Sequence, residues 1–179
     1  MVSLVKNTVL TLMIVSFTSF VSAEERDVDP WNGFNRAMFS FNENLDEYVL
    51  LPVTKGYRAI APEPVEKGVH NFFGNLGDVG SLFNSLFQLK FHDTLHNGLR
   101  ITANTFFGLA GLIDVATPMG FEKKYEDFGQ TLGYWGVETG PYLVLPFFGP
   151  SNVRDGISLI PDSYLDPVSK VEGDDARFM

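Results

Sequence analysis

The chain has 179 residues, a formal net charge of -9 at pH 7, no cysteine, and 17 phenylalanines beside 17 glycines. Its length predicts one domain, the lack of cysteine excludes disulfides and thiolate-bound metals within this sequence, and its acidic balance argues against nucleic acid, which requires basic side chains to neutralise phosphates. So much phenylalanine, which has no polar tip, indicates either a tightly packed core or a surface that faces something other than water.

The start of the chain has the pattern of a secretory signal peptide. Lys6 precedes an uncharged, largely apolar run over residues 8–20, and Val21 to Ala23 offer small or aliphatic side chains at the positions that signal peptidase reads. The run is short for a membrane span of about 20 residues. We therefore expect a signal peptide over residues 1–23, cleavage between Ala23 and Glu24, and one helical domain over residues 24–179.

Amphipathic helices are expected over much of the remaining chain. Asp29-Pro30 forms a helix start, because aspartate caps a helix and proline is tolerated at its first position. Apolar residues then recur every three or four positions over residues 31–48, which predicts a helix that ends before Pro52. A second stripe of the same kind covers residues 65–76.

Two further segments are apolar over most of the helix surface, which is typical of helices buried in protein or in lipid. The first covers residues 79–91 and carries Phe83, Phe87 and Phe91. The second covers residues 101–116, with only threonine, asparagine and one aspartate as polar residues. At about 1.5 Å per residue it is too short to cross a bilayer upright, so it could lie within one leaflet or in a core.

The sequence predicts an all-α fold, in which Tyr142 to Leu145 is the sole short strand candidate. The tripeptide Phe-Phe-Gly occurs at 72–74, 106–108 and 147–149, and we interpret it as a corner where two phenylalanines are buried and glycine ends a helix. The glycines at 74, 77 and 80 are interpreted as a flexible corner. Residues 128–150 are rich in glycine and proline, which predicts a wrapped loop with short helices.

Few residues suggest chemistry. His92 and His96 have the i, i+4 spacing of a zinc-binding pair, but Asp93 replaces the usual glutamate and no third histidine is near in sequence. A metal-dependent hydrolase is therefore a remote alternative. Arg100 and Asp114 are interpreted as an ion pair that holds two helices in register. We predict no catalytic residue, cofactor or metal, and the composition alone fits either a hydrophobic ligand or membrane association.

Three strings of the sequence resemble the VacJ/MlaA family. Residues 29–42 read DPWNGFNRAMFSFN, which is similar to the family's opening D-P-x-x-x-F-N-R-x-x-F/Y-x-F-N. Residues 100–116 match its pattern R-x-x-x-N-T-x-x-G-x-x-G-x-x-D-x-A, and residues 126–155 resemble its most specific signature through the strings EDFGQTLG, GPYLVLP and GPS. The resemblance covers about residues 29–167.

The resemblance implies a ring of helices in the inner leaflet of the Gram-negative outer membrane, around an amphipathic channel and bound to porins. Such a protein is expected to remove mislocalised phospholipid from the outer leaflet and to pass it to a soluble periplasmic carrier, which maintains lipid asymmetry. No enzyme activity is implied. The candidates for channel-lining or membrane-facing residues are Phe83, Phe87, Phe91, Phe106, Phe107, Gly108 and Gly111.

The sequence departs from the family at both ends. Family members typically carry a cysteine at the cleavage point, where this chain has Ala23-Glu24, so we expect a chain that is not lipid-anchored. The family also continues well beyond Asp166-Pro167, whereas this sequence ends at Met179. We therefore expect the domain to be incomplete at its C-terminal end, and the alternative function is a porin-associated scaffold that does not transport lipid.

Overall fold

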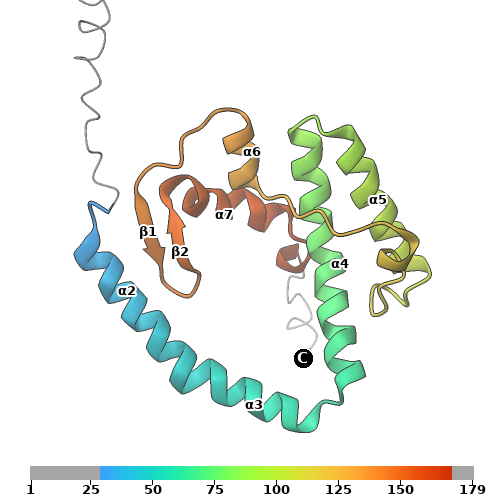
Figure 1. Ribbon diagram of the computed structural model, residues 1–179, viewed down its shortest axis with the longest axis horizontal. Helices are drawn as coiled ribbons and strands as arrows, with labels where there is room; N and C mark the ends of the chain where they lie inside the picture. Colours follow the sequence, from blue (N-terminus) through green and yellow to red (C-terminus); the bar gives the residue numbers. More distant parts are fainter. Residues whose placement is uncertain (1–28, 171–179) are drawn as a thin grey trace, which may run out of the picture.

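The computed structural model describes residues 29–170, so the predicted signal peptide and its cleavage site at Ala23 and Glu24 lie outside the described residues. The helices form an open ring (Figure 1). In chain order the elements are α2 (Asn32–Leu45), η2 (Asp46–Leu50), α3 (Leu51–Ile60), α4 (Glu63–Phe87), α5 (Phe91–Phe106), η3 (Thr117–Met119), α6 (Phe128–Tyr134), β1 (Tyr142–Leu145), β2 (Gly149–Asn152), α7 (Val153–Leu165) and η4 (Pro167–Lys170).

An arm of three consecutive helical segments, α2, η2 and α3, forms one side of the ring (Figure 1). The predicted stop before Pro52 is wrong, because the chain passes through a π-helical segment and Pro52 then occupies the first turn of α3. Pro52 has no N–H to donate to the preceding turn, and the π-helical segment η2 lies directly before it, so the helical path continues past the proline with altered bonding. The arm ends at Ala61, which is extended and precedes Pro62.

Helices α4 and α5 form an antiparallel pair on the opposite side of the ring (Figure 1). Helix α4 continues through Gly74, Gly77 and Gly80, so the predicted flexible corner at these glycines is wrong. The neighbouring residues favour helix strongly enough to outweigh about 1 kcal/mol per glycine. The pair turns at residues 88–90, which places Phe91 at the start of α5 rather than on the preceding helix.

The apolar segment after α5 is not helical to Ala116, as the sequence predicted, because α5 ends at Phe106. A turn follows in which Leu109, Ala110 and Gly111 have φ angles of 53°, 58° and 92°. The side chain of Asn104 holds this turn by accepting hydrogen bonds from the N–H groups of Val115 and Ala116, both at 2.9 Å. The hydrogen bonds of Asn104 therefore stabilise a turn here, although the apolar periodicity of residues 101–116 favours a longer helix.

The Phe-Phe-Gly tripeptides do not form one kind of corner. The first lies inside α4, the second begins at the last residue of α5, and the third covers the end of the β1–β2 turn and the first residue of β2. Their phenylalanines are not buried, since Phe106, Phe107, Phe147 and Phe148 are each at least 70% exposed.

The all-α prediction is confirmed, with one antiparallel hairpin formed by β1 and β2. Tyr142 pairs with Asn152 and Leu145 with Gly149, so the predicted strand candidate is β1. Helix α7 packs on this hairpin, on α6 and on α4, and closes the side of the ring that faces the arm. Within residues 29–170, no helix is both long enough and apolar enough to cross a membrane.

Candidate functional site

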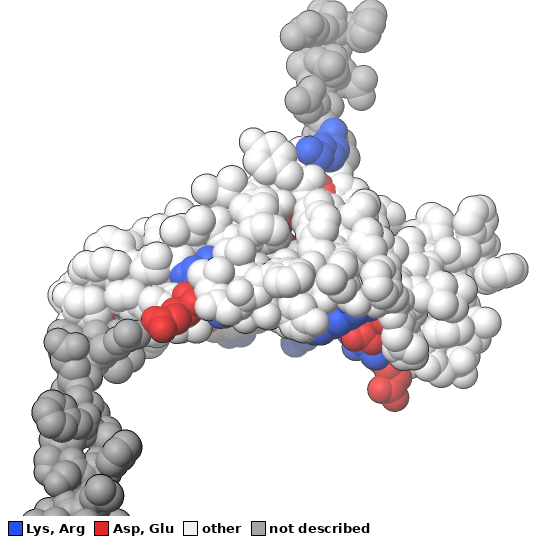
Figure 2. All heavy atoms as spheres, turned by 90° about the horizontal axis from the view of Figure 1, so that it is seen from above, with Lys and Arg blue, Asp and Glu red and all other residues white. Residues whose placement is uncertain are grey.

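The described part of the chain has polar side chains inside and apolar side chains outside. Its buried hydrophobic residues are small in number and size, namely Ala103, Ala116 and Val144. Its buried polar or charged residues are Asn35, Asn75, Asp78, Ser81, Asn84, Ser85, Gln88, Asn97, Arg100, Asn104, Thr131 and Ser158. Figure 2 shows the outer surface as mostly uncharged, with most of the charged side chains in view gathered along one border.

This distribution is unfavourable in water. Leaving a large apolar side chain exposed forgoes about 1.5–3 kcal/mol, and soluble monomers rarely expose continuous apolar patches of more than a few hundred Å². Ile60 is 85% exposed and Phe106 is 77% exposed, and they are two of many large apolar residues on the surface. The surface therefore suits an apolar medium or a large apolar partner.

The predicted membrane-facing phenylalanines all lie on the outer surface. Phe83 and Phe87 are 38% and 43% exposed on α4, Phe91 is 65% exposed at the start of α5, and Phe106 and Phe107 are at least 75% exposed at its end. Their role stays a prediction, but their placement is compatible with contact to acyl chains.

Gly108 and Gly111, which the sequence placed in the same group, are buried in the turn after α5. A Cβ atom on Gly108 would lie 2.0 Å from the carbonyl oxygen of Ile113, and one on Gly111 would lie 2.8 Å from Nδ2 of Asn75. Both glycines thus permit close packing of the turn, and they line neither of the cavities described below.

Arg100 is the centre of a buried charge cluster. The sequence paired it with Asp114, and the two are 3.5 Å apart, but the closer partner is Asp78 on α4, at 3.0 Å from Nε. Asp78 is fully buried and also forms an ion pair with Lys123, whose Nζ lies 3.0 Å from Oδ1 of Asp78. Burial acts to raise the pKa of Asp114, but hydrogen bonds from Thr117 and Asn104 and the charge of Arg100 outweigh it and lower the pKa.

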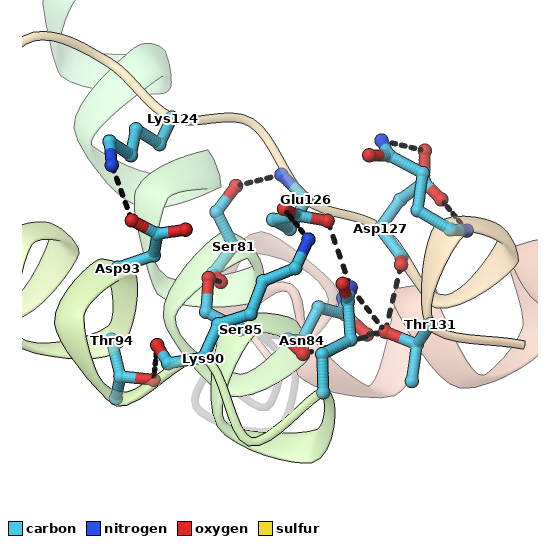
Figure 3. A network of polar contacts seen from close by, with 12 residues as sticks. Ser81, Asn84, Ser85, Lys90, Asp93, Thr94, Lys124, Glu126, Asp127 and Thr131 are labelled. Carbon is cyan, nitrogen blue, oxygen red and sulfur yellow. Dashed lines mark hydrogen bonds and ion pairs between the residues drawn. The ribbon is translucent and has the colours of Figure 1, made fainter. Parts of the chain in front are cut away.

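A second polar network joins α4 to the segment before α6 (Figure 3). Asn84 accepts a hydrogen bond from Thr131 at 2.9 Å, and Ser81 accepts one from the N–H of Glu126 at 3.2 Å. Lys90 pairs with Glu126 at 2.7 Å, and Lys124 pairs with Asp93. These bonds run from α4, α5 and the turn between them to residues 124–131. They hold in place the loop segment that crosses α4.

An amphipathic groove lies beside this network, where α4, α7 and the hairpin turn meet. We call it the α4–α7 groove. It consists of two adjoining cavities of about 330 and 230 Å³ that share Tyr125, Asp127, Phe148, Leu159 and Asp162. Gly77 and Gly80 of α4 form part of its wall, and a Cβ atom on either would meet nothing within 4 Å. The two glycines therefore widen the groove.

The groove carries carboxylates among its apolar walls. Asp162 accepts hydrogen bonds from Asn84 at 3.1 Å and from the N–H of Phe128 at 3.0 Å. Burial, and next the charge of Asp127, raise the pKa of Asp162 in spite of these bonds. Polar groups at one place and apolar walls at another are what an amphipathic ligand requires.

Two asparagines of α2 attach the arm to the hairpin. Asn35 donates to the carbonyl of Tyr142 at 3.2 Å and accepts from the N–H of Val144 at 2.8 Å. Asn42 donates to the carbonyl of Leu145 at 2.9 Å and accepts from the N–H of Phe147 at 2.8 Å. Sequence reasoning missed both residues, although their separation of seven positions places them on one face of the helix.

The histidine pair lies on α5 with its rings 6.2 Å apart. His92 contacts Asp93 at 3.1 Å, and Nε2 of His96 is 2.7 Å from the carbonyl oxygen of Glu122. Among the described residues, no group of three or more histidine, aspartate or glutamate side chains could hold a metal ion. The geometry of residues 29–170 therefore gives the pair no third ligand.

Three comparisons with known proteins, by family model, by related sequences and by solved structure, agree with one another. Residues 27–178 match the family model described as MlaA lipoprotein. A chain described as an uncharacterized protein, RT0044 of Rickettsia typhi, is 39% identical over 127 residues, which are 71% of this chain and 51% of that protein. This chain thus spans about half the length of that relative.

Two relatives are described as intermembrane phospholipid transport system lipoprotein MlaA. The one from Escherichia coli is 37% identical over 149 residues, 81% of this chain and 59% of that protein. The one from Haemophilus influenzae is 32% identical over 167 residues, 87% of this chain and 66% of that protein. A solved structure described as the "structural basis for maintenance of bacterial outer membrane lipid asymmetry" is similar with a TM-score of 0.71 and 36% identity, over 81% of this chain and 75% of that one.

Proposed function

This chain belongs to the MlaA lipoprotein family, and we propose that it acts in intermembrane phospholipid transport. In this proposal it removes mislocalised phospholipid from the outer leaflet of the outer membrane and passes it to a soluble periplasmic carrier, so that lipid asymmetry is maintained. Its relatives of known name are described as lipoproteins of such a transport system.

The observation that carries the proposal is the reversed distribution of polarity. Asp78, Asn84 and Arg100 are buried, while Phe106 and Phe107 are at least 75% exposed. In lipid, polar contacts between helices hold a structure together, because exclusion of apolar groups from water no longer does so. Since no described helix can span the bilayer, we propose that the ring lies flat within one leaflet, at the periplasmic face of the outer membrane.

The α4–α7 groove is the proposed lipid path. Its apolar members, among them Leu76, Phe148 and Leu159, would contact acyl chains, and Asp127 and Asp162 would face the headgroup. The partners proposed from the family are a porin and the soluble carrier. The exposed apolar side chains of the arm, which include Tyr48, Val53 and Ile60, are available to a porin wall.

The test is complementation of cells that lack their own MlaA protein, with outer-leaflet phospholipid as the readout and the amount of this protein measured in the outer-membrane fraction. We expect the wild type to lower outer-leaflet phospholipid. Gly80→Leu should fill part of the groove and abolish this effect with normal protein amount, because a Cβ atom at Gly80 meets nothing within 4 Å.

Gly56→Leu is the matched control. Gly56 lies in α3, away from the groove, and a Cβ atom there also meets nothing within 4 Å. It should complement like the wild type. If the wild type accumulates in the outer membrane, binds porin and restores nothing, the transport proposal fails for this chain and the porin-associated scaffold takes its place.

A further inference from the structure

The α4–α7 groove carries negative charge that no basic group on its wall balances. The carboxylates that line its two cavities are Glu126, Asp127, Asp155, Asp162 and Asp166. No lysine, arginine or histidine is among the described residues that line either cavity. The described wall of the groove is therefore acidic in some places and apolar in others.

Two of these carboxylates are neutralised by basic side chains from outside the groove. Oε1 of Glu126 lies 2.7 Å from Nζ of Lys90, and Oδ1 of Asp155 lies 2.8 Å from Nε of Arg154. Each of these ion pairs adds little net charge to the groove.

Asp127 and Asp162 have only neutral partners among the described residues. Asp127 accepts hydrogen bonds from the N–H of Gln130 at 2.7 Å and from Nε2 of the same residue at 3.2 Å. Asp162 accepts hydrogen bonds from Asn84 at 3.1 Å and from the N–H of Phe128 at 3.0 Å. Both side chains belong to partly exposed residues, and a carboxylate has about four acceptor sites. Both can therefore interact with a ligand in the groove.

The two carboxylates create one negative potential. Burial is the first cause that raises the pKa of Asp162, and the charge of Asp127 adds to it. Burial also raises the pKa of Tyr125, and the charges of Asp127 and Asp162 add to that shift. These three residues line both cavities, together with Phe148 and Leu159. Apolar walls strengthen such a potential, because they lower the local dielectric constant.

We infer that the α4–α7 groove selects phospholipids by net charge, favouring zwitterionic headgroups, such as phosphoethanolamine and phosphocholine, over net-negative ones, such as phosphoglycerol. A zwitterionic headgroup brings an ammonium group to Asp127 and Asp162, which offsets the repulsion of its phosphate. A net-negative headgroup brings the repulsion alone. The inference rests on the proposed function, because it takes the groove as the lipid path.

The experiment is equilibrium binding of short-chain lipids to the full chain in a nonionic detergent. The probes are dihexanoyl phosphatidylethanolamine, dihexanoyl phosphatidylcholine and dihexanoyl phosphatidylglycerol. The wild type should bind the two zwitterionic lipids about tenfold more tightly than phosphatidylglycerol, the scale of one charge–charge interaction in a partly screened site. A higher salt concentration should reduce this difference, because salt screens partly exposed charges.

Asp127→Asn removes one of the two charges and keeps the cap of α6, because asparagine caps a helix as well as aspartate does. It should tighten the binding of phosphatidylglycerol and so reduce the difference between the lipids to about threefold or less. Asp46→Asn is the matched control. It removes the same charge from η2 of the arm, where Asp46 lines neither cavity, and should leave the difference unchanged.

The outcomes separate the selectivity from the proposed function. Equal affinity for the three lipids in the wild type, a difference that salt does not reduce, or equal effects of Asp127→Asn and Asp46→Asn would each overturn the selectivity and leave lipid transport standing. Gly80→Leu should weaken the binding of all three lipids, and an unchanged preference at full affinity in this variant would place the selectivity outside the groove and overturn it. A wild type that binds none of the three lipids would overturn the transport proposal as well.

Discussion

The α2–η2–α3 arm and the α4–α5 pair are both helical and both apolar on their outer faces, but different contacts hold them in place. The pair is joined along its length by buried polar bonds, such as Asp78 to Arg100 and Asn97 to Ser85. The arm is joined to the hairpin by Asn35 and Asn42. Beyond η2, α3 makes no extensive contact with another described element.

The two regions should differ in rigidity if the protein lies in an apolar medium. Where water is absent, burial of apolar side chains contributes little to helix association, and polar bonds fix the arrangement. The α4–α5 pair, which is rich in such bonds, should open last. The arm, which has few, should open at a lower free energy and adapt to its neighbours.

The largest expected effect is at Asp78, and it tests whether buried polar bonds hold α4 against α5. Asp78→Ala leaves Arg100 buried without its closest partner, and breaking a buried ion pair in this way costs about 3–5 kcal/mol. We expect almost no folded protein in the membrane fraction and a much lower melting temperature in detergent. Asp93→Ala is the control, because its partner Lys124 is 39% exposed and the pair lies at the surface. A normal melting temperature for Asp78→Ala would show that the buried polar bonds between α4 and α5 do not hold the pair together.

The next effect tests whether the outer face of the pair meets lipid. Phe87→Asp puts a carboxylate on that face, which costs about 2.5–3.5 kcal/mol within a bilayer and little in water. We expect loss of membrane-associated protein. His92→Asp should be mild, because the side chain of His92 is 85% exposed and already polar. Similar small losses for both variants, measured as protein amount in the membrane fraction, would place this face in water.

A smaller effect is expected where the arm is attached. Asn42→Leu removes two bonds, to the carbonyl of Leu145 and from the N–H of Phe147, and the N–H of Phe147 loses its described partner, at about 1–3 kcal/mol. Hydrogen exchange should quicken in β1 and α2 but not in α4 or α5. Asn44→Leu serves as the control, since Asn44 bonds only the carbonyl of Ser40 within its own helix. Faster exchange throughout the chain would contradict an independent arm.

The smallest effect is on the pH dependence of stability. The pKa of Asp162 is raised, first by burial, so the folded chain keeps a proton that the unfolded chain has lost. Stability from this group is therefore present below the ordinary carboxyl pKa of about 3.9 and is lost as pH rises through the raised value. Asp162→Asn should remove this loss.

Asp114 offers the opposite case, because its pKa is lowered and its contribution is lost as pH falls through that lowered value. Chemical unfolding in detergent at a series of pH values checks both signs. An Asp162→Asn chain with the same pH profile as the wild type would refute the assignment to Asp162.

Much of the fold could be predicted from the sequence. The periodicity located the apolar faces of α2 and α4, and the family strings indicated the ring. Periodicity could not say which side of a helix faces inward, because a stripe that packs on a core and one that faces lipid have the same spacing. The side chains that are buried on α4, such as Asp78, Asn84 and Ser85, are polar and would have been expected on the outside.

The site was predicted less well, because its contacts join residues distant in the sequence. Arg100 was paired with Asp114, fourteen positions away, whereas its closest partner Asp78 lies on the preceding helix. The asparagines at 35 and 42 bond a hairpin more than 100 positions later. The end of α5 depends on the side chain of Asn104, which bonds the N–H groups of Val115 and Ala116. A pattern of apolar residues carries no information about such bonds.

The bonds from Asn35 and Asn42 have one more consequence, for the outer edge of β1. A two-stranded sheet has an open edge with unpaired N–H and carbonyl groups, which is costly in lipid and in water invites other strands to pair with it. The carboxamide of asparagine has the same donor and acceptor as a peptide group, so Asn35 bonds the carbonyl of Tyr142 and the N–H of Val144 in place of a third strand. Asn42 bonds the end of β1 and the turn that follows it. The hairpin is thereby protected from edge-to-edge pairing with other strands.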